Sequence, residues 1–123
     1  MKSENNLNLL FDLLEKTLEQ GGIWTLADVQ EFVAQEKMNI WTRDDAVALT
    51  SVEEHRDGNV LVIDLAGGSL NSLKDIEREI EKYARVQGFK YIYINGRKAW
   101  ERALPDYKLH TVILRKELTY EGS

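Results

Sequence analysis

The segment "NVLVIDLAGGSLNSLKDIEREIEKYARVQGFKYIYIN" (59–95) constrains the fold most, because it reads as a strand, a helix and a second strand in succession. Two strands joined by a helix pair in parallel through a right-handed crossover. The helical pattern of residues 69–87 follows directly on Gly67 and Gly68. A glycine turn that opens a helix can bind phosphate, since unpaired amides and the helix dipole favour an anion. It can also be only a sharp corner, because glycine accepts a positive φ.

Upstream of this unit, two β-rich runs predict an antiparallel hairpin over residues 46–65. They are "AVALTSVEE" and "NVLVIDLA", and the "HRDG" between them holds Asp57-Gly58, a strong hairpin signal. Alternation divides the second run between two faces, with Leu61, Ile63 and Leu65 on one and Val60, Val62 and Asp64 on the other. Because both faces are mostly apolar, we expect this strand to be central and covered on both sides.

The remaining elements are helices and short strands. The spacing of leucines predicts a helix over residues 5–19. Thr25 and Asp28 form a capping-box-like start for the next helix, and "NIWT" follows it as a short strand. After the crossover unit come a short helix in "RKAWERAL", closed by Pro105, and a last strand, "KLHTVILRKEL" (108–118).

These elements give the order α-α-β-β-β-α-β-α-β within a single domain over residues 1–123. The predicted class is α+β, with a mixed, mostly antiparallel sheet flanked by helices. Only the two strands of the crossover unit are expected to be parallel.

Composition argues against several classes of function. The net charge is −5 and no basic tract is present, so nucleic acid is not an expected partner. No apolar run reaches the roughly 18 residues that a membrane span needs, and the polar start does not read as a signal peptide. The chain has two distant histidines and no cysteine, so no metal site is expected.

The order of elements resembles the GNAT superfamily, the Gcn5-related N-acetyltransferases. Their pattern is two helices, an antiparallel meander, a strand, a phosphate-binding loop, a long helix, a strand, a short helix and a last strand. "IEREIEKYARVQGFKYIYI" looks like the GNAT long helix and following strand. "GRKAWERALPDYK" resembles the GNAT segment that reads N-x-x-A-x-x-x-Tyr and ends in Gly-Phe. When Asp106-Tyr107 is aligned with that Gly-Phe, Ala99 is aligned with the family alanine. The resemblance covers residues 6–118 and implies a GNAT-like fold.

Three stretches are closer still to a set of small tailed-phage proteins: "TLADVQEFVAQEKMNIWT", "DLAGGSLNSLKDIEREIEKYARVQGFKYIYINGRKAWERALPDYK" and "VILRKEL". This resemblance implies a GNAT-like bacteriophage protein, often encoded among virion or head-assembly genes. Its expected partners are other phage virion or assembly proteins. Its expected location is the host bacterial cytoplasm during infection, or the virion. GNAT-like sheets often pair across an open edge, so a homo-oligomer is a further expectation by analogy.

A working GNAT binds the acetyl-CoA pyrophosphate with backbone amides of a Q/R-x-x-G-x-G/A loop at a helix N-terminus. The corresponding stretch here, "LAGGSLN", has glycines but lacks the opening Arg or Gln and the G-x-G spacing. If acetyl-CoA binds, the residues that hold it are Gly67, Gly68, Ser69 and Leu70. In the alternative interpretation the glycines form a corner, Ser69 or Asn71 caps the helix, and no cofactor binds.

Acetyl transfer also requires groups that move protons. Many GNATs protonate the leaving thiolate with a tyrosine on the short helix. In the register above, that position holds Arg102, which cannot serve as the acid, and Tyr107 is the nearest replacement. The base would be Asp64 or Glu54. The alternatives are structural: Glu54 belongs to the solvated turn "EEHRDG", and Asp64 caps the glycine turn.

A second candidate site is "NGRKAWER", in which Arg97, Trp100 and Arg102 could hold an anion or stack on a partner. The alternative is that Trp100 packs into the core and Arg97 pairs with a helix acid. His110, in the last predicted strand, is expected to be a half-buried side chain rather than a ligand.

The leading hypothesis is a GNAT-like phage protein with a virion or assembly role and without acetyl transfer. The order of elements, the degraded loop and the misplaced tyrosine motivate it. The chief alternative is an active acetyl-CoA-dependent N-acetyltransferase with a divergent pyrophosphate loop. A host-directed inhibitor with an acidic surface is a third, weaker alternative. The fold alone does not choose among them, because function resides in the site.

Overall fold

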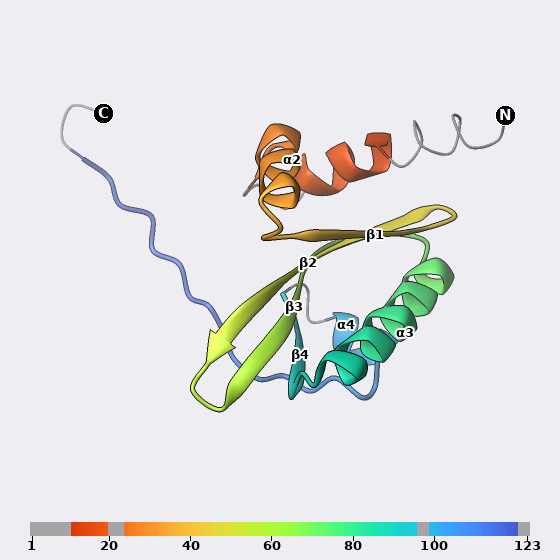
Figure 1. The fold of residues 1–123 in the computed structure, drawn as a ribbon. Helices are drawn as coiled ribbons and strands as arrows, with labels where there is room; N and C mark the ends of the chain where they lie inside the picture. Colours follow the sequence, from red (N-terminus) through yellow and green to blue (C-terminus); the bar gives the residue numbers. More distant parts are fainter. Residues whose placement is uncertain (1–10, 20–23, 96–98, 121–123) are drawn as a thin grey trace, which may run out of the picture.

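The computed structural model describes residues 11–19, 24–95 and 99–120 (Figure 1). Residues 11–19 are helical. The elements that follow are α2 (Leu26–Ala34), β1 (Asn39–Arg43), β2 (Ala46–His55), β3 (Gly58–Gly68), α3 (Leu70–Gln87), β4 (Tyr91–Ile94) and α4 (Ala99–Ala103). Among these residues, four strands form one sheet in the order β1-β2-β3-β4. β4 is parallel to β3 and the other pairs are antiparallel, so the α+β class, the hairpin and the parallel crossover are confirmed.

Helices cover both faces of this sheet, with α3 on one side and helix 11–19 and α2 on the other (Figure 1). The buried side chains on the α3 face are Ala46, Ala48, Leu61, Ile63, Leu73, Ile76 and Ile80. Those on the opposite face are Leu14, Leu18, Val29, Met38, Val47 and Leu49. β2 and β3 therefore contribute alternate side chains to two cores, which explains why both strands are apolar on both faces.

The described helix ends agree with the predicted capping residues. Thr25 and Asp28 form a reciprocal capping box: the Asp28 amide donates to Thr25 Oγ1 (3.2 Å) and the Thr25 amide donates to the Asp28 carboxylate (3.0 Å). α3 begins after Ser69 and ends at Gly88, whose φ of 78° is the left-handed conformation that glycine favours. The first half of the predicted N-terminal helix lies outside the described residues.

The alternation predicted for β3 is wrong at one position. β2 and β3 pair as Leu49 with Leu65 and then as Thr50 with Ile63, so Asp64 is an extra residue in β3. Such a β-bulge shifts the alternation by one residue. Leu65 therefore packs against the core beneath helix 11–19 and α2, whereas Ile63 faces α3.

The last predicted strand is also wrong, so the observed order lacks the final β of α-α-β-β-β-α-β-α-β. Residues 108–118 pair with no strand of the described part of the chain. They are exposed, and after α4 they lead away from the helices and the sheet (Figure 1). An alternating apolar sequence becomes a strand only when another strand edge accepts it, and no edge within the described domain does so.

Candidate functional site

The junction between β3 and α3 is built around a carboxylate from a different part of the chain. Ser69 is the N-cap of α3, and its hydroxyl oxygen accepts from the Ser72 amide (3.4 Å). Both serines donate their hydroxyls to Asp45 Oδ1, at 2.8 Å from Ser69 and 2.7 Å from Ser72. Asp45 lies in the turn between β1 and β2. The Ser72 hydroxyl, and then that of Ser69, lower the pKa of Asp45 below its ordinary value. A negative charge is thus fixed at the start of α3, where the helix dipole favours it.

Both glycines of this junction allow close packing. Gly68 has a φ of +124°, and a Cβ there would overlap the backbone of Asp45 and Ala46. A Cβ on Gly67 would overlap the side chain of Thr17 on helix 11–19. Both glycines also belong to the ladder between β2 and β3. These contacts explain the two glycines without a ligand and support their interpretation as a corner.

The start of α3 combines a short connection with a nearby negative charge. The connection from β3 to α3 is the single residue Ser69, which leaves no loop to wrap an anion. A phosphate that approached the helix N-terminus would meet the Asp45 carboxylate, a like charge that already accepts both serine hydroxyls. The structure brings Gly67, Gly68, Ser69 and Leu70 together, as the sequence implies, but it places a carboxylate beside them.

Close to this corner, β4 ends while β3 continues. Their pairing ends at Ile63 and Ile94, although β3 continues to Gly68. Asp64 is the first residue of β3 beyond that pairing, so the bulge lies just past the end of β4. Asn95, the residue after β4, still donates its amide to the Ile63 carbonyl at 3.0 Å.

Asp64 itself is a half-buried carboxyl group whose Oδ2 atom has no hydrogen-bond partner among the described residues. Burial raises the pKa of Asp64; the Ser51 hydroxyl offsets part of this rise and the Glu53 charge adds to it. Ser51 lies on the same face of β2 as Leu49, because side chains alternate along a strand. Asp64 therefore lies on the face opposite α3.

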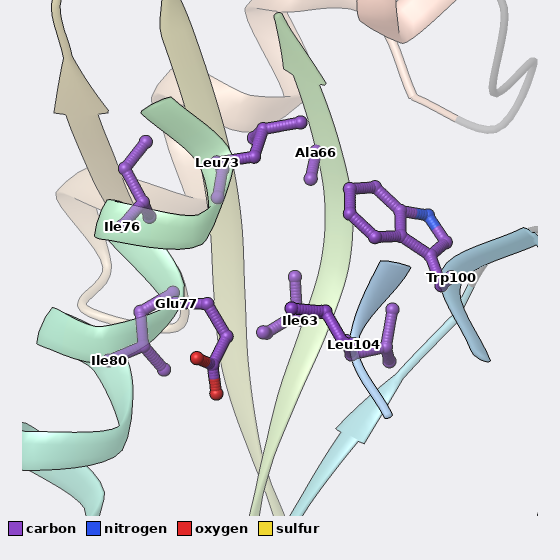
Figure 2. Close-up of a pocket in the computed structure, with 10 residues that line it drawn as sticks. Ile63, Ala66, Leu73, Ile76, Glu77, Ile80, Trp100 and Leu104 are labelled. Carbon is purple, nitrogen blue, oxygen red and sulfur yellow. The ribbon is translucent and has the colours of Figure 1, made fainter. Parts of the chain in front are cut away.

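A pocket lies between α3, α4 and the sheet (Figure 2). Part of this space is open to solvent. Among the described residues that line it, Glu77 is the only charged one, and the others are Ala48, Ile63, Ala66, Leu73, Ile76, Ile80, Ile94, Trp100 and Leu104. Figure 2 shows Glu77 on α3 and Trp100 on the opposite side of this space. Chemically, the pocket suits an apolar group, with one carboxyl at its wall.

Tyr107 holds the carboxyl group of Glu77, because its hydroxyl donates to Glu77 Oε1 at 3.0 Å. Burial raises the pKa of Glu77, and the hydrogen bond from Tyr107 offsets part of the rise. Burial, and then the Glu77 charge, raise the pKa of Tyr107 above its ordinary value. A hydroxyl with a raised pKa is a weaker proton donor, so this contact favours a role for Tyr107 in tying the segment after α4 to α3.

The residues predicted as acid and base are not brought together. Tyr107 contacts α3, whereas Asp64 lies on the other face of the sheet. Glu54 is exposed near the turn of the β2–β3 hairpin. Its neighbours Glu53 and His55 form an exposed pair, with 2.9 Å between Glu53 Oε2 and His55 Nε2. The predicted catalytic roles of Asp64, Glu54 and Tyr107 stay predictions.

The residues of "NGRKAWER" are likewise divided. Trp100 is partly buried against the α3 core, as the packing alternative predicts. Arg102 is exposed on α4, and Arg97 lies outside the described residues. His110 is exposed rather than half-buried, because no strand forms there, and its ring lies 5.0 Å from that of Tyr93.

Sequence reasoning missed Asp45 and Glu77. Glu77 was detectable, because it lies four residues after Leu73 and three before Ile80, on the buried stripe of α3. Asp45 gave no comparable signal, since it reaches its serine partners from 24 and 27 residues away.

Within residues 11–19, 24–95 and 99–120, no three His, Asp or Glu side chains are grouped so that they could hold a metal ion. In the same ranges no helix combines the length and the apolar character that crossing a bilayer requires.

No protein-family model matches the chain, and no curated protein sequence matches it. Solved structures do match. One, described as a probable acetyltransferase, has a TM-score of 0.67 at 10% identity, over 92% of this chain and 95% of that one. An aminoglycoside acetyltransferase from an uncultured soil metagenomic sample has a TM-score of 0.65 at 13% identity, over 94% and 92%. A Trypanosoma brucei acetyltransferase has a TM-score of 0.65 at 15% identity, over 94% of each chain.

The chain therefore has a GNAT-like fold: a mixed sheet flanked by helices, in the arrangement of these acetyltransferases. At 10–15% identity the likeness concerns the fold alone. The descriptions of these three structures name no phage.

Proposed function

We propose that this GNAT-like domain acts by binding other proteins and does not transfer acetyl groups. The observation that carries the proposal is the Asp45 carboxylate at the start of α3, held by the hydroxyls of Ser69 and Ser72. A fixed negative charge there opposes the binding of a pyrophosphate. The separation of Asp64 from Tyr107 by the sheet adds support, since a base and an acid on opposite faces cannot serve one substrate.

Calorimetric titration with acetyl-CoA tests this proposal. We expect no binding heat from the unaltered protein at millimolar ligand. Asp45→Asn keeps an oxygen that accepts from both serines but removes the charge, so any affinity gained by this variant measures the repulsion. Asp57→Asn is the matched control, because it removes one exposed carboxylate and leaves an equally good Asn-Gly turn. Micromolar binding by the unaltered protein would overturn the proposal.

A narrower form of the proposal is that the partners are virion or assembly proteins of a tailed phage, in the host cytoplasm or in the particle. The sequence resemblance to small tailed-phage proteins supports it. Two observations test it: the neighbourhood of the gene, and mass spectrometry of purified virions. A locus without phage genes would refute it. A phage locus with no chain in the particle would restrict the role to the infected cell.

The second candidate function is an active acetyl-CoA-dependent N-acetyltransferase. The part of β3 that continues beyond the end of β4 and the apolar pocket on the α3 side favour this candidate, because among the described residues they leave an unpaired strand edge near a space for an apolar group. Gly67 to Leu70 would then hold the cofactor at the corner. The test is release of free thiol from acetyl-CoA in the presence of a panel of amines. Release that Asp64→Asn reduces would support this candidate over the first.

A further inference from the structure

The pocket between α3 and α4 combines an apolar lining with one carboxylate. Ile63, Leu73 and Ile76 are among the residues of the sheet and of α3 that line it. Glu77 and Trp100 lie on opposite sides of the space (Figure 2). Because part of the space is open to solvent, a group from another molecule can enter it and exchange water for apolar contacts.

The carboxylate of Glu77 has no cationic partner among the described residues. Arg78, the next residue of α3, forms its ion pair with Asp75 at 2.7 Å. Arg85, further along the same helix, forms its ion pair with Glu81 at 2.9 Å. A half-buried carboxylate without a compensating charge is costly, because burial removes the water that would otherwise solvate it. A cation brought by another molecule would compensate this charge.

The charges around Glu77 also favour a cation. Burial is the largest cause of the raised pKa of Glu77, and the negative charges of Glu81 and Asp106 add to it. Arg78 offsets part of this rise, but its guanidinium is held by Asp75. This side of the pocket is therefore negative, so it attracts a positively charged group and repels an anion.

The shape of the site suits a planar cation. Tyr107 donates its hydroxyl to Glu77 Oε1 at 3.0 Å, and among the described residues the second oxygen, Oε2, receives no hydrogen bond. A guanidinium carries several N–H donors in one plane and stacks on aromatic rings, whereas an ammonium is a compact, strongly hydrated charge. The indole of Trp100, across the space from Glu77, is such a ring. The methylene stem of an arginine can lie along the apolar lining.

We propose that this pocket binds an arginine side chain of a partner protein, with the guanidinium between Glu77 and Trp100 and the methylene stem on the apolar lining. The source of the arginine rests on the proposed function, which is protein binding. Arginine is enriched among the residues that dominate protein interfaces, where it fills desolvated pockets. Free arginine suits the site less well, because its own carboxylate would lie near the acids on this side of the pocket.

The first test compares propylguanidinium, which reproduces the end of an arginine side chain, with propylurea, which has nearly the same planar shape and no charge. Binding is followed by the indole N–H signal of Trp100 in NMR spectra, assigned with Trp100→Phe. We expect roughly millimolar binding of propylguanidinium and about tenfold weaker binding of propylurea. Equal affinity for the two probes, or a Trp100 signal that neither probe moves, would overturn the proposal.

Glu77→Gln separates the charge of the site from its shape. The amide keeps an oxygen that accepts from Tyr107, so propylguanidinium should bind about tenfold more weakly while propylurea binds as before. Glu79→Gln is the matched control, because Glu79 is a carboxylate of α3 that pairs with Arg43 on β1 at 3.0 Å. Its removal should change the affinity by less than about twofold. Thermal melts of both variants check that the fold is intact. Equal losses in the two variants would mean that the general acidity of the chain attracts the probe, and the proposal would fail.

The second test concerns the source of the arginine. The same NMR signal is titrated with an Ala-Arg-Ala peptide capped at both ends, with its Ala-Lys-Ala counterpart and with free arginine. We expect the arginine peptide to bind most tightly of the three. A lysine peptide that binds equally well, or free arginine that binds more tightly than the peptide, would refute the proposal.

These titrations are independent of the titration with acetyl-CoA. A failure of propylguanidinium to bind would refute this inference and leave the proposed function standing. Micromolar binding of acetyl-CoA would refute the proposed function, whereas the preference for a guanidinium over a urea at Glu77 would still be measured directly.

Discussion

Replacement of Gly68 by alanine gives the sharpest check on the corner between β3 and α3. The added Cβ meets two separate penalties. A non-glycine residue at a φ of +124° costs about 1–3 kcal/mol. The overlap with the backbone of Asp45 and Ala46 forces a shift of the kind that costs about 1–3 kcal/mol more. We therefore expect Gly68→Ala to lower the free energy of unfolding by about 2–6 kcal/mol, a large part of the total for a small domain.

Gly58 provides the control that separates these two penalties. Its φ of +128° is nearly the same, but nothing lies within 4 Å of a Cβ built on it. Gly58→Ala should cost only the conformational part, about 1–3 kcal/mol. The effect of alanine on the unfolded chain is common to both variants and cancels in the comparison.

Urea unfolding followed by tryptophan fluorescence measures the difference. With an m-value of about 2 kcal/mol/M, an extra 2 kcal/mol places the midpoint of Gly68→Ala about 1 M below that of Gly58→Ala. Equal midpoints for the two variants would refute the close approach at the corner. If both variants lose stability and the midpoint of Gly68→Ala is much the lower of the two, a substitution at position 68 reports on folding and not on cofactor binding.

Three further predictions concern other contacts. Burial raises the pKa of Glu77, so the folded protein binds a proton at this carboxyl more tightly than the unfolded chain does, and stability falls as pH rises above about 4.5. In thermal melts, Glu77→Gln should therefore be more stable than the unaltered protein at pH 7 and equally stable near pH 4. A difference in stability that stays constant across that range would contradict this. Trp41 Nε1 donates to the buried Thr50 hydroxyl at 2.8 Å, so Trp41→Phe should lower the free energy of unfolding by about 1 kcal/mol or more. Thr50→Val should lower it less in the Trp41→Phe variant than in the unaltered protein, because the hydrogen bond is already lost there. Thr25→Ala should cost about 1 kcal/mol of stability by chemical unfolding, whereas Thr25→Ser, which keeps the cap, should not.

Local patterns were sufficient to predict most of the fold. The Asp57-Gly58 turn, the stripe of α3 and its glycine end are each determined by neighbours in the sequence, and each is confirmed. The segment 108–118 was mispredicted for a physical reason. Its alternation is that of a strand, but pairing depends on an edge elsewhere in space, which no local pattern records.

The candidate site was harder to predict, because its decisive contacts are non-local. The sequence shows that Gly67-Gly68 precede a helix and lack the surrounding motif. It does not show that Thr17 packs against one glycine, or that Asp45 lies at the helix start. Those contacts depend on how the β1–β2 turn and helix 11–19 meet the corner, and only the assembled sheet determines this.

The bulge at Asp64 can be separated from the rest of the architecture. Leu49 pairs with Leu65 and Thr50 with Ile63, so a chain without residue 64 would have an unbroken ladder. Every other side chain of β3 would keep its present face, and both cores would keep their members. The insertion therefore contributes nothing that the core requires; it adds one carboxyl group, that of Asp64, just past the last pair of β3 with β4. A one-residue deletion would thus alter the geometry of the site while sparing the fold, which no substitution at this position can do.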